Sequence, residues 1–367
     1  MRILILDTYY PAFQEHFYRK YPEAAQKRYA EQKTALFAEC FGTADFYSTN
    51  LKKFGHDAEE LIVNNEILQK QWAKEHGVFY KKAYFSNIPK IRNYFASDWQ
   101  EKILEAQIQE FKPDVLYCQS LSMPNAGFLG RMKKHIKLIV GQVASPVVFD
   151  KKALGAFDLI TTSFPHFVER FRKIGIASEY FKIGFEPRVL DKLAPPQKKY
   201  NTVFVGGISK RHAESIDAFE YLSRNTGIDF WGYGSNELPP DSPIREKHHG
   251  EAWGIEMYDI LHNAKISVNR HIDAAENFAN NMRLYESTGV GTMLITDHKD
   301  NLHELFEVGK EVETYRTKEE LLEKIQHYLT HEEEREKIAQ AGQQRTLKDH
   351  TYEIRMKELA VILEKYL

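Results

Sequence analysis

The sequence has few cysteines, no long apolar run and almost no excess of charge of either sign. Only Cys40 and Cys118 occur among its 367 residues, which argues against a secreted, disulfide-bonded scaffold and favours a reducing, cytoplasmic location. The apolar run 3–6 ends at Asp7 and is too short for a signal-peptide core, and no stretch is long enough for a membrane-spanning helix. With 50 basic and 52 acidic residues, the net charge of -2 gives no general reason to expect nucleic-acid binding.

Several motifs of nucleotide, hydrolytic and metal chemistry are also absent. The sequence contains neither the G-x-x-x-x-G-K-[ST] loop of P-loop kinases nor the G-x-G-x-x-G fingerprint of dinucleotide sites. It lacks the G-x-S-x-G elbow of many hydrolases and the H-E-x-x-H motif of zinc proteases. Two cysteines cannot complete a zinc site with the histidines, so we expect no bound metal.

The length and the pattern of apolar runs predict an α/β protein of two domains. A chain of 367 residues exceeds one ordinary core, and its composition of 43% hydrophobic and 28% charged residues is that of a globular protein. Short apolar runs alternate with helical stretches, which indicates parallel sheets. The expected strands are 3–6, 60–64, 115–118, 138–141, 158–162, 202–205, 229–231, 265–269 and 292–296. The helical stretches 14–55 and 66–112 are long for connections, so we expect a helical insertion in the first domain.

Residues 193–199, Leu-Ala-Pro-Pro-Gln-Lys-Lys, have the composition of a linker between the two domains. The first domain then covers 1–192 and the second 193–349. The charged segment 317–367, which includes the end of the second domain, is expected to be helical and to be divided at Gly342.

The most informative stretch is N-F-A-N-N-M-R-L-Y-E-S-T-G-V-G-T-M-L-I-T-D (277–297), a polar turn, a short helix and an apolar strand. Asn281 is expected to cap the helix, and Gly289 to end it in a left-handed conformation. A helix start binds anions through its free N–H groups, and Arg283 adds a charged fork beside them. Glu286 projects from the same face and can accept hydrogen bonds from vicinal hydroxyls, as on a ribose. The whole string favours a pocket for a nucleotide-sugar, whereas each residue alone also fits a surface Arg–Glu pair.

This stretch resembles the donor-binding segment of GT-B glycosyltransferases, most closely the CgeB-like (spore maturation protein-like) family. The resemblance continues in N-L-H-E-L-F-E-V-G-K-E-V (301–312), Y-R-T-K-E-E-L-L-E-K-I (315–325), H-E-E-E-R-E-K-I-A-Q-A-G-Q (331–343) and H-T-Y-E-I-R (350–355). It implies two Rossmann-like domains facing a cleft, with the donor on the second domain, the acceptor on the first, and helix 350–367 packed back on the first. Many retaining members have two Glu separated by seven residues. Glu286 matches the second, but Phe278 occupies the position of the first.

Other strand ends supply further donor-binding candidates. Gly206 and Gly207 open G-G-I-S-K-R-H (206–212), where a ligand can approach the backbone and Arg211 can neutralise a diphosphate; the alternative is a flexible turn. Tyr233, in W-G-Y-G, can border a nucleotide base, or the motif is a core Trp followed by a glycine turn. We interpret His271 as a polar residue at the rim. The donor-binding candidates are Gly206, Gly207, Arg211, Tyr233, Asn269, Arg270, Asn281, Met282, Arg283 and Glu286.

The first domain supplies candidates for the acceptor. Asp7, Tyr9 and Tyr10 follow the first strand and are expected to contact it. His16 and His166 can take a proton from a hydroxyl near neutral pH, although each is equally a structural or surface histidine. The catalytic candidates are His16, His166, Arg211 and Glu286.

We therefore expect a hexosyltransferase-like glycosyltransferase of bacterial glycan biosynthesis. Its donor is a UDP-, GDP- or dTDP-linked sugar, its acceptor a hydroxyl of a glycan, a lipid-linked molecule or a protein, and no further cofactor is expected. The D-x-D motif with which GT-A enzymes hold a metal is absent, and the resemblance implies metal independence and retention of configuration. Peripheral contact with a membrane stays open. The alternatives are a non-catalytic nucleotide-sugar-binding or scaffold protein and a GT-B-shaped nucleotide-sugar epimerase.

Overall fold

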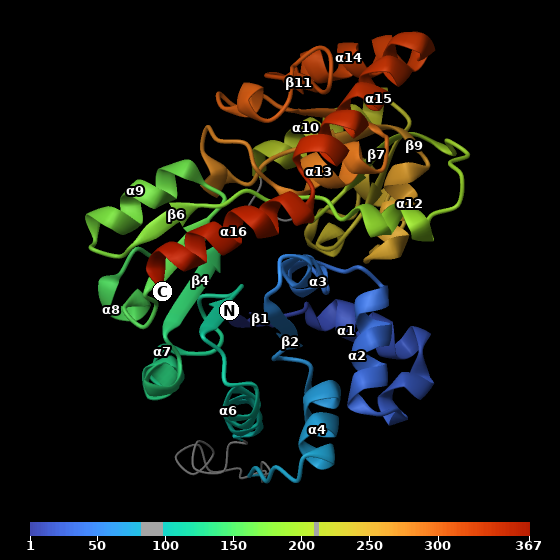
Figure 1. Cartoon of the computed structure of the whole chain (residues 1–367). Coiled ribbons are helices and arrows are strands. Elements are labelled where there is room, and N and C mark those ends of the chain that lie inside the picture. The colour runs from blue at the N-terminus through green and yellow to red at the C-terminus, as the bar shows by residue number, and fades with distance from the viewer. Residues whose placement is uncertain (82–97, 209–212) are drawn as a thin grey trace.

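The computed structural model describes residues 1–81, 98–208 and 213–367. The chain forms two lobes, each built on one parallel sheet with helices around it (Figure 1). The predicted α/β architecture with two sheets is confirmed. Among the described helices, none is both long and apolar enough to cross a membrane.

The first sheet has six strands in the order β2-β1-β3-β4-β5-β6, all parallel. They are β1 (Arg2–Asp7), β2 (Asp57–Ile62), β3 (Val115–Cys118), β4 (Leu138–Val143), β5 (Leu159–Thr162) and β6 (Ser178–Tyr180). β1 pairs with both β2 and β3, so the winding of the sheet reverses at β1. Ligands of such sheets bind outside the carboxyl ends of strands at this reversal, which places Asp7 at a favoured position.

Helices cover the first sheet and form the expected insertion between β1 and β2. In chain order they are α1 (Pro11–Lys20), η1 (Pro22–Gln26), α2 (Tyr29–Ala38), α3 (Phe46–Lys53), α4 (Glu66–Glu75), α6 (Trp99–Phe111), α7 (Ala126–Met132), η2 (Lys133–His135), α8 (Lys151–Leu154), α9 (Pro165–Lys173) and η3 (Pro187–Lys192). Four of them, α1, η1, α2 and α3, lie on the β1–β2 connection, where an aromatic core that includes Phe13 and Phe17 anchors the insertion.

The second sheet has five parallel strands in the order β11-β10-β9-β7-β8. They are β7 (Tyr200–Val205), β8 (Ile228–Trp231), β9 (Ala264–Asn269), β10 (Met293–Asp297) and β11 (Glu313–Tyr315). The helical elements of this half are α10 (Ala213–Asn225), η5 (Ser235–Glu237), α11 (Pro243–Glu246), α12 (Ile255–His262), η6 (Asp273–Ala275), α13 (Met282–Gly289), η7 (Leu302–Glu304), α14 (Lys318–Thr330), α15 (Glu332–Asp349) and α16 (Tyr352–Tyr366). Winding reverses at β7, which pairs with β8 and β9, so the turn at Gly206 lies at the second favoured position.

The last helix, α16, returns to the first lobe. The ring of Tyr352 lies 5.3 Å from Phe46 and 5.6 Å from Tyr47 of α3, between ring centroids. Near the chain end, Lys365 Nζ bonds the carboxylate of Glu179 at 2.6 Å. Figure 1 shows α16, in red, running along the boundary between the lobes. The division at 192/193 stays our proposal, and this helix adds a second link between the lobes.

The structure corrects two predictions about glycines and adds two strands that were not predicted. Gly342 does not divide the C-terminal helices; it lies inside α15, where an added Cβ would come 2.3 Å from the carbonyl oxygen of Glu311. Gly289 is the last helical residue of α13 and packs against the ring of Phe185. It is not a left-handed cap; the positive φ, +79°, belongs to Gly291. The edge strands β6 and β11 were not predicted, since three residues are too few to show alternation.

Candidate active site

A cavity of about 620 Å³ lies between the carboxyl ends of the two sheets. Its size is typical of small-molecule sites. The cavity brings together most of the predicted residues, namely Asp7, Tyr9, Tyr10, Gly206, Gly207, Tyr233, Asn269, Arg270, Asn281, Met282, Arg283 and Glu286. Arg211 lies outside the described residues.

The two catalytic histidine candidates are not among the residues that line the cavity. His16 lies in α1 and is partly exposed. The ring of His166 stacks between Phe164 and Phe278, and its Nε2 lies 3.1 Å from the carbonyl oxygen of Ala274. Burial lowers the pKa of His166. The structure therefore brings neither imidazole to the cavity, and the assignment of either as a base is not supported by this geometry.

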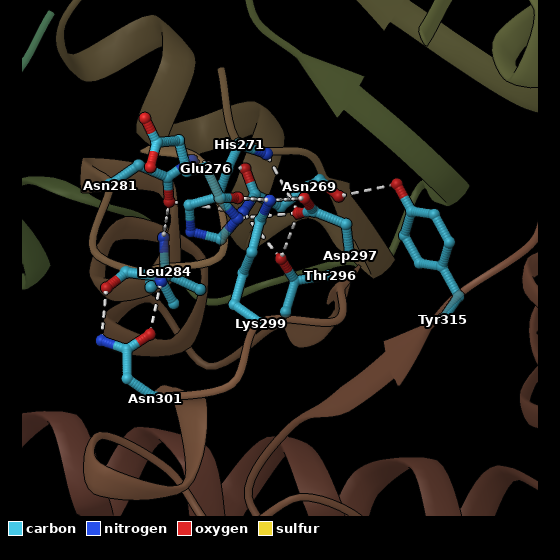
Figure 2. Close-up of polar contacts among 11 residues, drawn as sticks. Asn269, His271, Glu276, Asn281, Leu284, Thr296, Asp297, Lys299, Asn301 and Tyr315 are labelled. Atoms are coloured by element: carbon cyan, nitrogen blue, oxygen red, sulfur yellow. Dashed lines mark hydrogen bonds and ion pairs between the residues drawn. The ribbon is translucent and has the colours of Figure 1, made fainter. Parts of the chain in front are cut away.

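The start of α13 is held open toward the cavity by paired asparagines. Asn281 caps the helix as expected, because its side chain accepts a hydrogen bond from the backbone N–H of Leu284 at 3.3 Å. The amides of Asn281 and Asn269 bond each other reciprocally, at 3.0 and 3.3 Å, and so connect the helix start to the end of β9 (Figure 2). The N–H groups of Met282 and Arg283 stand in the first turn, where helical N–H groups have no intrahelical acceptor. This helix start is therefore suited to an anion.

Arg283 and Glu286 form an ion pair in the cavity wall. Arg283 Nη1 lies 2.9 Å from Glu286 Oε2, and the two side chains are only 14% and 7% exposed. The alternative interpretation of a surface pair is therefore wrong. Burial raises the pKa of Glu286, while the charge of Arg283 and a hydrogen bond from Tyr258 act in the opposite direction. Nη1 also contacts the sulfur of Met257 at 3.3 Å. Since a guanidinium carries five N–H donors, the pairing orients the group and leaves donors for a bound anion.

A buried His–Asp pair supports the loop that leads to α13. His271 Nδ1 lies 2.7 Å from Asp297 Oδ1, and the backbone N–H of His271 donates to the same oxygen at 3.0 Å (Figure 2). Burial alone would raise the pKa of Asp297, but its hydrogen bonds with His271 and the charge of Lys299 lower it to about 2. The side chain of His271 is fully buried, so the expectation of a rim residue is corrected. His271 also lines the cavity, and its Nε2 has no hydrogen-bond partner among the described residues.

Two interlocked glycine turns form the opposite side of the donor end. A Cβ at Gly232, whose φ is +128°, would lie 2.0 Å from the carbonyl oxygen of Gly206. A Cβ at Gly207 would lie 2.6 Å from the ring of Tyr233, so this ring covers the turn. Trp231 is buried, as the core interpretation held, whereas Tyr233 is 45% exposed. Only glycines allow this close approach of the two turns.

The two lobes touch through aromatic rings that line the cavity. The ring of Tyr10, from the first lobe, lies 6.0 Å from Tyr233 and 5.9 Å from Trp253 of the second, between centroids. Trp253 was not predicted as a site residue. Thr43, Gln119 and Gln142 also line the cavity without having been predicted. Gln119 follows directly after β3, so the strand-end rule that selected Asp7 would also have found it.

Comparisons with known proteins agree with this architecture. A family model described as glycosyl transferase-like matches residues 211–360. HepE of Anabaena in complex with UDP-glucose is similar with a TM-score of 0.60, at 13% identity over 100% of both chains. Sucrose-phosphate synthase of Thermosynechococcus elongatus has a TM-score of 0.59 at 9% identity, covering 100% of this chain and 98% of that one. A glycosyltransferase of Rickettsia africae has a TM-score of 0.58 at 14% identity, with the same coverage. No curated protein sequence matches the chain.

These findings define the class: the chain has the GT-B fold, with two Rossmann-like lobes facing a cleft. The predicted resemblance to GT-B glycosyltransferases is confirmed by the shared fold and by the match of residues 211–360 to the family model. The closer placement in the CgeB-like family stays a prediction.

Proposed function

We propose that this protein is a glycosyltransferase that moves a sugar from a nucleotide-sugar donor to a hydroxyl of an acceptor. The observation that carries the proposal is the buried Arg283–Glu286 pair at the open start of α13, in a cavity between the two sheets. A diphosphate is matched by the helix N–H groups and the guanidinium, and a ribose by the carboxylate of Glu286.

The same groups account for catalysis through the leaving diphosphate. Negative charge grows on the diphosphate as the glycosidic bond breaks, so donors fixed in advance by the fold act mainly in the transition state. We assign this role to Arg283, the first turn of α13 and Arg211. The turn at Gly206 and Gly207 allows the phosphates to approach the backbone. Closure of the lobes excludes water, which competes with the acceptor.

We propose a UDP-linked sugar as the first donor to test, because the structurally similar HepE is seen with UDP-glucose. GDP- and dTDP-linked donors remain in the proposal. Tyr233 is assigned to the nucleotide base, and Asn269, Arg270, Asn281 and Met282 to the phosphates and sugar. Asp7, Tyr9 and Tyr10 are assigned to the acceptor.

We also propose that the reaction needs no metal and retains the anomeric configuration. Arginines and helix N–H groups supply the positive potential for the diphosphate. Among residues 1–81, 98–208 and 213–367, no three His, Cys, Asp or Glu side chains are grouped to hold a metal. In a retaining reaction the leaving phosphate oxygen takes the proton of the acceptor hydroxyl, so no protein base is required.

The test is release of nucleoside diphosphate from a panel of nucleotide-sugars with and without a mixture of glycan acceptors. The proposal expects release that depends on the acceptor. Binding of the donor without turnover would support a scaffold protein instead, and conversion of the donor's sugar without an acceptor would support an epimerase.

A further inference from the structure

Four polar side chains gather in the first-lobe wall of the cavity, opposite the donor end. Asp7 ends β1, Gln119 follows β3 and Gln142 lies in β4, which are three adjacent strands, and Thr43 joins them from the loop before α3. All four line the cavity. Thr43 Oγ1 lies 2.9 Å from Gln119 Oε1 and 3.4 Å from Asp7 Oδ2. We name this set of four residues the acceptor wall.

The carboxyl group of Asp7 is buried without full compensation. Oδ1 accepts a hydrogen bond from the backbone N–H of Thr8 at 2.7 Å. Among the described residues Oδ2 has only the long contact with Thr43, whose single proton can also go to the nearer oxygen of Gln119. Burial raises the pKa of Asp7 to about 7, and the two groups that oppose this are neutral hydrogen-bond donors, not a cation. Oδ2 therefore has acceptor capacity left for a ligand, and above about pH 7, where the carboxyl group is ionised, it would repel an anionic ligand.

Gln142 offers the complementary group. Its Oε1 accepts hydrogen bonds from Tyr117 OH at 2.7 Å and from Tyr47 OH at 3.1 Å. With the amide oxygen on these two phenols, the amide nitrogen is the group left for other partners. Nε2 bonds no described residue, and Gln142 lines the cavity, so its N–H donors are available to a ligand there. The acceptor wall thus offers a sugar one hydrogen-bond acceptor, on Asp7, and one hydrogen-bond donor, on Gln142.

Aromatic faces stand beside these polar groups. Phe41 lies 5.9 Å from Tyr10 and 5.4 Å from Trp253, between ring centroids, and all three residues line the cavity. Gly42, with φ of +60°, lets this loop turn close to Asp7, since an added Cβ would lie 4.0 Å from Asp7 Oδ2. The combination matches a pyranose, which has apolar C–H faces and hydroxyl edges.

We propose that the acceptor wall and these rings bind an uncharged sugar, so that the acceptor of the reaction is a neutral glycan. The inference rests on the proposed function, and it selects one among glycan, lipid-linked and protein acceptors. One sugar hydroxyl donates to Asp7 and another accepts from Gln142, while the ring face packs on Tyr10, Phe41 or Trp253. A phosphate or carboxylate in the same place would face the carboxyl group of Asp7, whose pKa is raised by burial and lowered by the hydrogen bonds from Thr8 and Thr43.

The experiment titrates UDP first and then matched sugars into the protein saturated with UDP. The sugars are maltose, cellobiose and methyl β-glucoside, and the pair glucose and glucose 6-phosphate. We expect at least one neutral glycoside to bind, and glucose 6-phosphate to bind at least about tenfold more weakly than glucose. Asp7→Asn should weaken binding of the neutral sugar about tenfold and leave UDP binding unchanged. It should also reduce the difference in affinity between glucose and glucose 6-phosphate. Asp114→Asn, at the opposite end of β3, is the matched control and should change neither affinity.

Equal or tighter binding of the phosphorylated sugar would overturn the inference, as would unchanged sugar affinity in Asp7→Asn. Failure of every neutral sugar to bind while UDP binds would also overturn it and leave the donor site standing. Failure of the wild-type protein to bind any of UDP, GDP and dTDP would count against the proposed function instead.

Discussion

Arg283 Nη1 lies 2.9 Å from Glu286 Oε2, one turn apart on α13, and both side chains are almost fully buried in the cavity wall. Exposed pairs of this spacing contribute little to stability, and burying a pair is costly for the fold. An Arg–Glu pair kept at a cavity beside a helix start is therefore better explained by ligand binding than by stability. In the function that we propose, each partner holds the other in place for one part of a nucleotide.

Replacement of Arg283 by alanine should weaken binding of UDP by roughly 1.5–3 kcal/mol, the scale of a charged hydrogen bond, and affect uridine much less. Calorimetric titration of both ligands measures this. Arg224→Ala is the control, because Arg224 pairs with Glu220 on the exposed surface of α10. An equal loss for UDP and uridine would give Arg283 a purely structural role.

Replacement of Glu286 by glutamine should reduce the preference of the protein for UDP over 2′-deoxy-UDP. The wild-type protein is expected to bind UDP more tightly than 2′-deoxy-UDP by about 1.5 kcal/mol, because a buried carboxylate is a strong acceptor for the hydroxyl. Glu286→Gln should reduce this difference. Competition binding with the two nucleotides gives the ratio, and a variant that keeps the full preference would remove Glu286 from the ribose site.

Treatment with excess EDTA should leave the turnover rate unchanged within about twofold, since arginines and helix N–H groups meet the diphosphate charge. The control is the same assay with added Mg²⁺ or Mn²⁺. A complete loss of activity that either metal restores would contradict the donor site as assigned.

The stability of the fold should depend on pH through Asp7. Its pKa is raised from 3.8 to about 7, so the folded state holds this proton more tightly than the unfolded chain. The stabilising contribution is complete below about pH 4 and is lost as the pH rises to about 7. At pH 8 Asp7→Asn should therefore be more stable than wild type by roughly 1–3 kcal/mol. Urea unfolding at pH 4 and pH 8 tests the sign, and a less stable variant at pH 8 would refute it.

Residues that follow local rules could be predicted from the sequence. Asn281 caps a helix, Asp7 ends a strand and Gly206 follows one. Arg283 and Glu286 share a helix face, so each of these residues is placed by its immediate neighbours. Their common cavity follows because both sheets are parallel and turn their carboxyl ends toward each other.

Residues that are placed by contacts between distant segments could not be predicted from the sequence. Trp253 reaches the cavity because Gly254, with φ of +54°, packs on the carbonyl oxygen of Glu39 in the other lobe, where an added Cβ would come within 2.1 Å. Gln142 is held at the cavity by contacts of its amide oxygen with Tyr47 and Tyr117, which come from other parts of the first lobe. The choice of His166 rested on residue type, and its stacking on Phe278 depends on the packing of one lobe against the other.

Transfer of a sugar at this cavity is tested most directly by proton NMR of the newly formed product. The donor is the nucleotide-sugar that raises the melting temperature most, and the acceptor is a neutral glycan. We expect a new glycosidic anomeric signal with the configuration of the donor, and the same product from His16→Ala and His166→Ala at substantial kcat. Donor sugar that stays on the nucleotide, or appears only as free sugar or an epimer, would contradict the claim. An inverted anomer, together with a loss of kcat of about a thousandfold in one histidine variant, would make that histidine a base and refute retention.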